Sequence, residues 1–209
     1  MNINKNILLL AETNFILDLI FEQAPESERL FVLARKHDLQ LIVPEYSFAE
    51  AEGNIGTTIQ KRHASLDTAL VALKQSERSA YHDVIPLIQQ LEHFKTRSIA
   101  EEQPNLHAKI EHLAQIASII PFSGDIAARA ELRGLRRLAP MKASDRNIYE
   151  SILHFAQANR SPGTQMIFLT RDIGDFDFPY LHQELAELSV ELRFSAGDCI
   201  RRIRELLEI

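Results

Sequence analysis

Five short segments with the character of strands, separated by helical segments, are the feature that most constrains the fold of this chain. The clearest is Met166–Leu169, which has no helical period and lies between turn residues, as expected of a strand buried on both faces. The predicted strands are Asn6–Ala11, Leu39–Val43, Ser118–Phe122, Met166–Leu169 and Val190–Phe194. Because strands that alternate with helices form parallel sheets, we predict an α/β fold of three layers, α/β/α, around a roughly five-stranded, parallel, doubly wound sheet.

A long helical segment interrupts this alternation. Gly53 and Gly56 predict a break after the second strand, and the chain beyond them is almost wholly helical as far as about residue 118. Three apolar stripes at helical spacing predict faces that pack on a core. Their residues are Ile59, Leu66, Leu70 and Leu73; Val84, Leu87, Ile88 and Leu91; and Leu106, Ile110, Leu113 and Ala117. We therefore expect a single domain over residues 1–209, with residues 53–118 as a helical insertion.

Capping residues and prolines place the other helices. We expect Asn14 to open the helix after the first strand, Pro44 the helix after the second, and Ser144 to cap the helix that leads into the fourth. The remaining predicted helices are Pro25–His37, one that is capped by Ser123 or Asp125 and runs through Leu135, Tyr180–Leu188, and Gly197–Glu208.

The composition, 45% hydrophobic and 25% charged over 209 residues, is typical of a globular domain with one sizeable core. We expect a cytoplasmic protein without membrane contact, because no apolar segment reaches roughly 18 residues and Ile7–Ala11 is too short for a signal peptide.

The single Cys199 cannot form an internal disulfide. Zinc-like spacing is absent among Cys199 and the histidines His63, His82, His93, His107 and His112. The net charge of −6 argues against a protein that coats nucleic acid, but not against a nucleic-acid enzyme whose acids bind divalent cations.

Acidic residues follow the fourth strand closely. Four acceptor side chains lie within eight residues beyond its carboxyl end, where open α/β sheets bind ligands: Thr170, Asp172, Asp175 and Asp177. Carboxylates this close repel one another unless a cation lies between them. An ordinary acidic turn, in which Asp side chains accept hydrogen bonds from nearby amides, explains the same pattern. This segment alone leaves both a cation site and a plain turn open.

Three further acids are expected at the same edge of the sheet. Glu12 follows the first strand, and Glu50 lies about a turn and a half into the helix after the second. Asp145 is in the first turn of the helix before the fourth strand, where an end charge that stabilises the helix dipole is the simpler explanation. Since the carboxyl ends of parallel strands share one edge, these three acids and Asp172 can converge there.

With these acids the chain resembles the PIN-domain family of metal-dependent nucleases. The matching segments, in chain order, are Glu12-Thr13-Asn14, Ser47-Phe48-Ala49-Glu50, Ser144-Asp145, and Thr170-Arg171-Asp172 with Asp175-Phe176. Each segment alone is a weak signal, but four in this order and strand context are fairly specific. The resemblance covers about residues 1–52 and 119–194, and residues 53–118 match nothing known to us.

The resemblance implies a site for one or two Mg²⁺ or Mn²⁺ ions. The implied ligands are Glu12, Asp145 and Asp172, while Glu50 and Asp175 would bind a second ion or orient water. The residues expected to hold these carboxylates by hydrogen bonds are Thr13, Asn14 and Thr170. The candidate phosphate contacts are Lys142, Arg146 and Arg171, although a solvated charged surface is the simpler explanation of each one alone.

One residue departs from the family pattern. The family usually has Asp where this chain has Glu12, and the extra methylene moves the carboxylate by roughly 1.5 Å. A shift of this size can retune or disable a metal site, whereas a longer acid can also fold back or bind in bidentate fashion. The sequence leaves an active enzyme and a degenerate one open.

The implied activity is hydrolysis of phosphodiester bonds inside single-stranded RNA, which leaves 5′-phosphate and 3′-hydroxyl ends. The chemistry needs no 2′-hydroxyl, so DNA stays open as a substrate. The expected partners are an RNA substrate, an antitoxin-like protein inhibitor, since many bacterial family members are toxins, and a second copy of the chain. The alternative is a catalytically degenerate PIN-like protein that binds RNA or protein. A phosphotransfer enzyme is disfavoured, because no Gly-rich phosphate loop follows the first strand.

Overall fold

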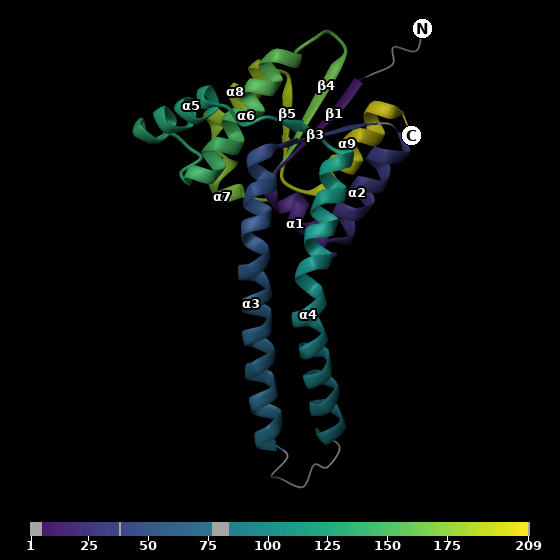
Figure 1. Cartoon of the computed structure of the whole chain (residues 1–209). Coiled ribbons are helices and arrows are strands. Elements are labelled where there is room, and N and C mark those ends of the chain that lie inside the picture. The colour runs from purple at the N-terminus through teal and green to yellow at the C-terminus, as the bar shows by residue number, and fades with distance from the viewer. Residues whose placement is uncertain (1–5, 38, 77–83, 209) are drawn as a thin grey trace. The chain divides into compact units, whose positions relative to one another are not determined.

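The computed structural model describes residues 6–37, 39–76 and 84–208, so that His82 lies outside the described residues. Its elements, labelled in Figure 1, are β1 (Asn6–Ala11), α1 (Thr13–Phe21), α2 (Pro25–Lys36), β2 (Gln40–Pro44), α3 (Glu45–Ser76), α4 (Val84–Ile116), β3 (Ser118–Ile120), α5 (Gly124–Leu135), α6 (Ala143–Asn159), β4 (Thr164–Leu169), α7 (Ile173–Phe176), α8 (Pro179–Glu187), β5 (Val190–Arg193) and α9 (Ala196–Leu207). This order confirms the predicted alternation of strands and helices.

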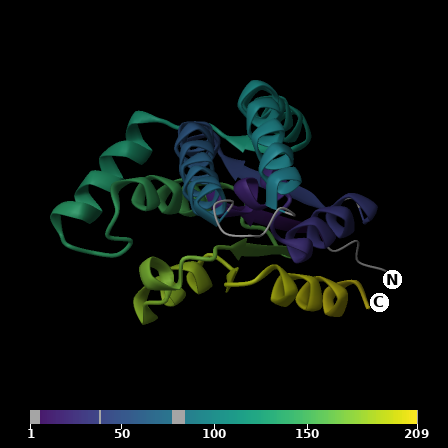
Figure 2. The same cartoon turned by 90° about the horizontal axis from the view of Figure 1, so that it is seen from below.

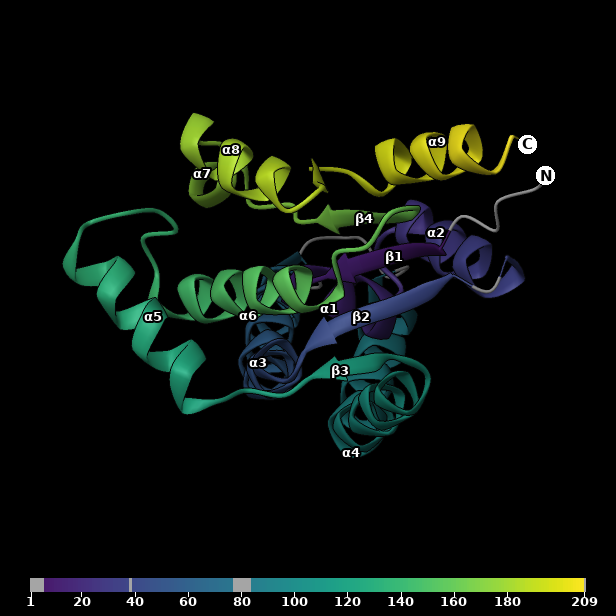
Figure 3. The ribbon, with the colours of Figure 1, turned by 90° about the horizontal axis from the view of Figure 1, so that it is seen from above.

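The strands form one parallel sheet in the order β3-β2-β1-β4-β5. Figure 3 shows β2, β1 and β4 side by side. The chain moves from β1 to β2 and β3 in one direction and then returns to add β4 and β5 on the other side of β1. The strand order therefore reverses beside β1, and open α/β sheets bind their ligands at such a point, beyond the carboxyl ends of the strands. The predicted three-layer α/β/α fold with a parallel five-stranded sheet is confirmed.

Alternating residues of the strands fill a core on each face of the sheet. Leu8 and Leu10 of β1 belong to a buried cluster with Phe168 of β4 and Tyr149 of α6. Ile7 and Leu9 alternate with them, so they face the opposite side, where they are 2% and 0% exposed. The helices α2 and α9 pack against each other (Figure 1), as do α5 and α6 (Figure 2). Burial on both faces explains the continuous apolar runs of the sequence.

The predicted break at Gly53 and Gly56 is wrong, because α3 runs through both glycines without interruption. A glycine inside a helix costs only about 1 kcal/mol relative to alanine. Two neighbours on the helix, Ile55 and Ile59, are 0% and 8% exposed, and burial of one such side chain contributes about 1.5–3 kcal/mol. The apolar stripe therefore outweighs the glycines.

The chain divides into two compact units, one made of Met1–Ala51 with His112–Ile209 and the other of Glu52–Glu111. In the second unit, Leu70 and Ile88 are buried as predicted. Leu87 was predicted to be buried as well, but it is 45% exposed. Ion pairs join its two helices: Arg62 with Glu102, Asp67 with Lys95, and Lys74 with Glu92. As the α3 partner moves forward along the chain the α4 partner moves back, so the two helices are antiparallel.

Several predicted boundaries differ by a few residues. Pro44 ends β2 instead of opening the next helix, and β3 stops at Ile120. The helix α6 begins at Ala143, and its N-cap is Lys142, whose side chain makes no capping hydrogen bond, so Ser144 lies inside the first turn. The one-turn helix α7, within the acidic segment after β4, was not predicted.

Candidate metal centre

Glu12 is a buried carboxylate directly beyond β1. It caps α1, where Asn14 was expected to do so, because its Oε2 accepts a hydrogen bond from the Asn14 amide at 2.9 Å. Its side-chain Oε1 is buried and has no hydrogen-bond partner among the described residues. Burial, with a further contribution from the Asp145 charge, raises the pKa of Glu12 to about 7 despite hydrogen bonds from Asn14. The structure thus leaves one buried acceptor of Glu12 unsatisfied.

Asp145 lies in the first turn of α6, as predicted, and its side chain is 15% exposed. Its Oδ2 is buried without a hydrogen-bond partner among the described residues. Burial raises the pKa of Asp145 to about 6; the ammonium of Lys142 lowers this pKa, and the charges of Asp175, Glu50 and Asp172 raise it. Asp145 therefore feels the charges of Asp175, Glu50 and Asp172, and its own charge acts on Glu12.

The acidic segment after β4 is folded around its own carboxylates. Asp172 caps α7: its Oδ1 accepts from the Asp175 amide at 3.1 Å, and its own amide donates to Thr170 Oγ1 at 3.1 Å. Asp175 is 9% exposed and accepts from the Met141 amide at 3.2 Å. Asp177, by contrast, is exposed and bonds His182. The interpretation as an acidic turn is therefore correct for the local hydrogen bonds, and Asp177 takes no part in the cluster.

Asp145, Asp172 and Asp175 each offer an oxygen within 4.8 Å of the other two, an arrangement that could hold a metal ion. The Lys142 ammonium lies among them, with Nζ 2.6 Å from Asp175 Oδ2, 2.9 Å from Asp172 Oδ2 and 3.5 Å from Asp145 Oδ2. Burial raises the pKa of Asp175, but the hydrogen bonds from Lys142 and Met141 outweigh it, so that this pKa is lowered. The sequence grouped Glu12 with Asp145 and Asp172; the structure brings Asp175 closer to these two aspartates.

Glu50 is half-buried in the second turn of α3 and accepts a hydrogen bond from Thr13 Oγ1. Thr13 thus holds a carboxylate, as expected from the sequence, and Thr170 does so through the amide of Asp172. Asn14 supports Glu12 through its backbone amide. All these groups follow the carboxyl ends of β1, β2 and β4.

The three candidate phosphate contacts differ in the groups that their charged side chains bond. Arg146 donates from Nε to the Ala130 carbonyl at 3.1 Å and also to the Met141 carbonyl, so its guanidinium is directed at the protein backbone. The side chain of Arg171 is 57% exposed but pairs with Asp18 of α1, which the sequence analysis did not single out. Lys142 bonds the acidic cluster itself. Asp18 could have been noticed in the sequence, because it is a charged residue within the otherwise apolar helix that follows Glu12.

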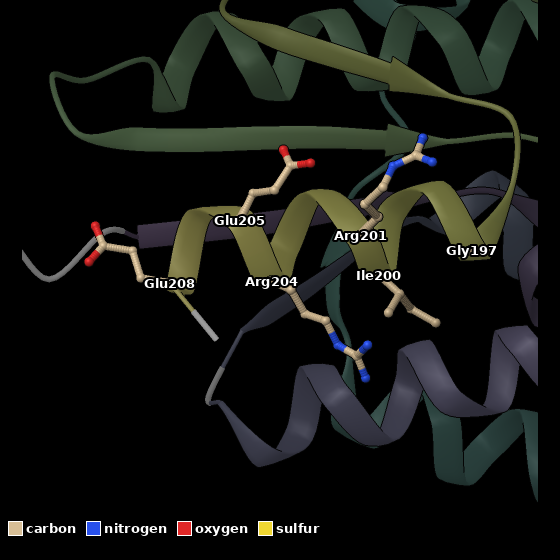
Figure 4. A pocket seen from close by; sticks show the side chains of 6 residues that line it. All are labelled: Gly197, Ile200, Arg201, Arg204, Glu205 and Glu208. Carbon is tan, nitrogen blue, oxygen red and sulfur yellow. The ribbon is translucent and has the colours of Figure 1, made fainter.

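A shallow pocket of ≈580 Å³ lies along α9 (Figure 4). It is lined by Gly197, Ile200, Arg201, Arg204, Glu205 and Glu208. None of the residues predicted for the site lines it, and we assign it no chemistry.

No helix among the described residues is long and apolar enough to cross a membrane.

A comparison with family models matches the chain to the PIN domain over residues 9–176. The chain belongs to the PIN-domain family. The match contains Glu12, Glu50, Asp145, Asp172 and Asp175, and it also spans the described parts of α3 and α4. PIN domains are generally nucleases that use divalent metals. No curated protein matches the chain.

The PIN site of this chain fits a divalent cation. All the acids that converge on it are oxygen donors, which is the ligand set that Mg²⁺ and Mn²⁺ prefer. Glu12 Oε1 and Asp145 Oδ2 are buried acceptors without a hydrogen bond among the described residues, and buried polar atoms are normally satisfied. A cation already lies among three of the carboxylates, in the form of the Lys142 ammonium. A metal ion bound to Glu12 and Asp145 would satisfy both orphan oxygens.

A buried arginine, which was not predicted as part of the site, bonds the segment that leads to Lys142. Arg133 is 8% exposed; it donates to Glu150 at 2.7 Å, to Glu184 at 2.8 Å and to the Ala139 carbonyl at 3.0 Å, and it stacks over the Tyr149 ring. The Ala139 amide in turn donates to the Tyr180 hydroxyl. These bonds hold Ala139, which lies shortly before the Met141 amide and the Lys142 ammonium that bond the acidic cluster.

The raised pKa of Glu12 predicts that the metal-free protein loses stability as the pH rises. A carboxyl whose folded pKa is about 7, against an ordinary 4.5, binds its proton more tightly in the folded state. Its destabilising effect therefore develops between these two values and amounts to on the order of 3 kcal/mol above pH 7. We expect a lower melting temperature in EDTA at about pH 8 than at about pH 5.5, and expect Mn²⁺ to restore it at the higher pH.

Glu12→Gln provides the control for this melting experiment. The amide cannot ionise, so the variant should lose most of the difference between the two pH values that depends on this site. A variant with the same pH dependence as the wild type would show that Glu12 does not cause it.

Proposed function

We propose that this PIN-domain protein is a metal-dependent endoribonuclease that hydrolyses single-stranded RNA. The observation that carries the proposal is the convergence of carboxylates from four segments at the point of the sheet where the strand order reverses. These carboxylates belong to Glu12, Glu50, Asp145, Asp172 and Asp175. Two of them keep a buried oxygen that has no hydrogen bond from the described part of the chain, which supports a bound cation.

The residues have separable roles in this proposal. Glu12, Asp145 and Asp172 would hold Mg²⁺ or Mn²⁺, which when bound acidifies water and offsets charge on the phosphoryl oxygens. Glu50, oriented by its bond from Thr13, is the acid available to orient the attacking water and accept its proton. Lys142 is 61% exposed, so its ammonium can also meet a phosphate of the substrate.

A cleavage assay tests both the substrate and the reaction. We expect purified protein with Mn²⁺ to cut a labelled single-stranded RNA internally, to cut DNA of the same sequence more slowly, and to leave 5′-phosphate and 3′-hydroxyl ends. Products that end in a 2′,3′-cyclic phosphate would contradict metal-assisted hydrolysis, because they form by attack of the 2′-hydroxyl. Faster cleavage of the DNA would overturn the choice of RNA as substrate.

A second candidate function is RNA or protein binding without catalysis. It is favoured by Glu12, where the family usually has Asp, and by the lysine that already neutralises part of the cluster. A protein of this kind would bind the RNA but leave it intact in Mn²⁺. An antitoxin-like inhibitor, a homodimer and a cytoplasmic location stay predictions.

A further inference from the structure

We infer that this site takes a single divalent ion and that Lys142 supplies the second positive charge, in the place where a second ion would bind. The inference rests on the proposed function, and it gives Lys142 a positioning role beyond that of a surface phosphate contact. Its basis is the difference between the carboxylate oxygens that already bond the Lys142 ammonium and those that do not.

The carboxylates of Asp172 and Asp175 already share one cationic partner, the ammonium of Lys142. Lys142 Nζ donates to Asp175 Oδ2 at 2.6 Å and to Asp172 Oδ2 at 2.9 Å, which are distances of charge-assisted hydrogen bonds. The other oxygen of each aspartate accepts a backbone amide: Asp172 Oδ1 accepts from Asp175, and Asp175 Oδ1 accepts from Met141. A second metal ion bound by Asp172 and Asp175 would have to displace the Lys142 ammonium, because two cations held by the same carboxylates repel each other.

The carboxylate of Glu12 has no such partner among the described residues, and that of Asp145 has only a longer contact with Lys142. Glu12 Oε1 and Asp145 Oδ2 are buried without a hydrogen bond among the described residues, and Lys142 is 3.5 Å from the latter, beyond a normal bond for an ammonium. Glu12 directly follows β1, and Asp145 is in the first turn of α6, which leads into β4 next to β1. One divalent ion held by these two oxygens would offset the charges of Glu12 and Asp145.

The ammonium is held in place by the fold around it. Lys142 is the N-cap of α6, and it follows a segment whose backbone is bonded on several sides. Arg133 and Tyr180 hold Ala139, while Arg146 and Asp175 hold the carbonyl and the amide of Met141. Of the three ammonium donors, two bond carboxylates of the described residues, which leaves one for a phosphate oxygen.

Calorimetric titration of the full chain with Mn²⁺ tests the inference without use of the cleavage reaction. We expect one ion per chain for the wild type and two for Lys142→Met, which frees Asp172 and Asp175 for a second ion. Lys142→Arg keeps the charge and should bind one ion. The matched control is Lys95→Met, which makes the same change at a lysine paired with Asp67 in the helical unit, and it should also bind one.

The outcomes separate this inference from the proposed function. Two ions bound by the wild type, or one ion bound by a folded Lys142→Met, would overturn the inference and leave a metal-dependent nuclease intact. If Lys142→Met is unfolded, Lys142→Gln takes its place in the same titration. Absence of Mn²⁺ binding by the wild type and every variant would overturn the proposed function and the inference with it.

Discussion

Asp145→Asn is expected to lower kcat/KM for RNA cleavage by at least about 100-fold and, in EDTA, to raise the melting temperature by a few degrees. The two effects have one cause. The Asp145 carboxylate is partly buried, has an oxygen without a hydrogen bond and lies among other acids, so its charge destabilises the metal-free fold. Asparagine keeps the shape and removes the charge, and the metal ligand is lost with it.

The control for this variant is Asp177→Asn, which removes an acid of the same segment that is exposed and bonds His182. Its cleavage rate should stay within about twofold of the wild type, as is usual for substitutions away from a reacting group. Kinetics and thermal melting in EDTA measure both effects. A folded Asp145→Asn protein that cleaves as fast as the wild type would show that Asp145 does not hold a catalytic ion.

Arg133→Ala is expected to lower the free energy of unfolding by about 3–5 kcal/mol, the usual cost of removing one partner of a buried ion pair. Glu150 is 6% exposed and would keep its charge in the core without its closest cation. The Ala139 carbonyl would also lose its donor, which loosens the segment before Lys142. Urea denaturation of the wild type and the variant measures the difference.

Arg129→Ala is the matched comparison, because Arg129 approaches the same Glu150, at 3.7 Å, from a side chain that is 39% exposed. Exposed pairs contribute about 0–1 kcal/mol, so this variant should lose far less stability. Equal losses for the two variants would mean that helix content or net charge, and not the buried network, explains the effect of Arg133.

The sheet and the position of the acids could be predicted because both depend on local patterns. Burial on both faces gives β1, β2 and β4 continuous apolar runs, and Asn6–Ala11 is the exact extent of β1. Parallel strands end at one edge, so Glu12 and Asp172 had to be near each other once the order of elements was known. Asp145 joined them because α6 feeds β4 from that edge.

Helix limits were harder to predict, because competing effects there are small and nearly equal. The cost of Gly53 and Gly56 is about 1 kcal/mol each, and buried side chains such as Ile55 outweigh it. Glu12 takes the cap that Asn14 was expected to form, because its Oε2 accepts a hydrogen bond from the amide of Asn14, two residues further along the chain.

The partners of the charged side chains could not be predicted at all. Arg171 pairs with Asp18 across 153 positions of the chain, and Arg133 joins Glu150 to Glu184. No local spacing relates such residues, because the tertiary fold alone brings them together. The same holds for Lys142. Its neighbours in the sequence indicate a lysine on the surface, whereas in the structure its ammonium lies within the acidic cluster.

The most direct test of the central claim is cleavage of a labelled single-stranded RNA by the wild-type protein in Mn²⁺ and in EDTA, with Asp145→Asn purified in parallel. We expect internal cleavage by the wild type that requires Mn²⁺, stops in EDTA and is lost in Asp145→Asn. Equal cleavage by both proteins, or cleavage that persists in EDTA, would contradict a metal-dependent reaction at these carboxylates. RNA left intact by the wild type and by Glu12→Asp would point instead to a binding protein.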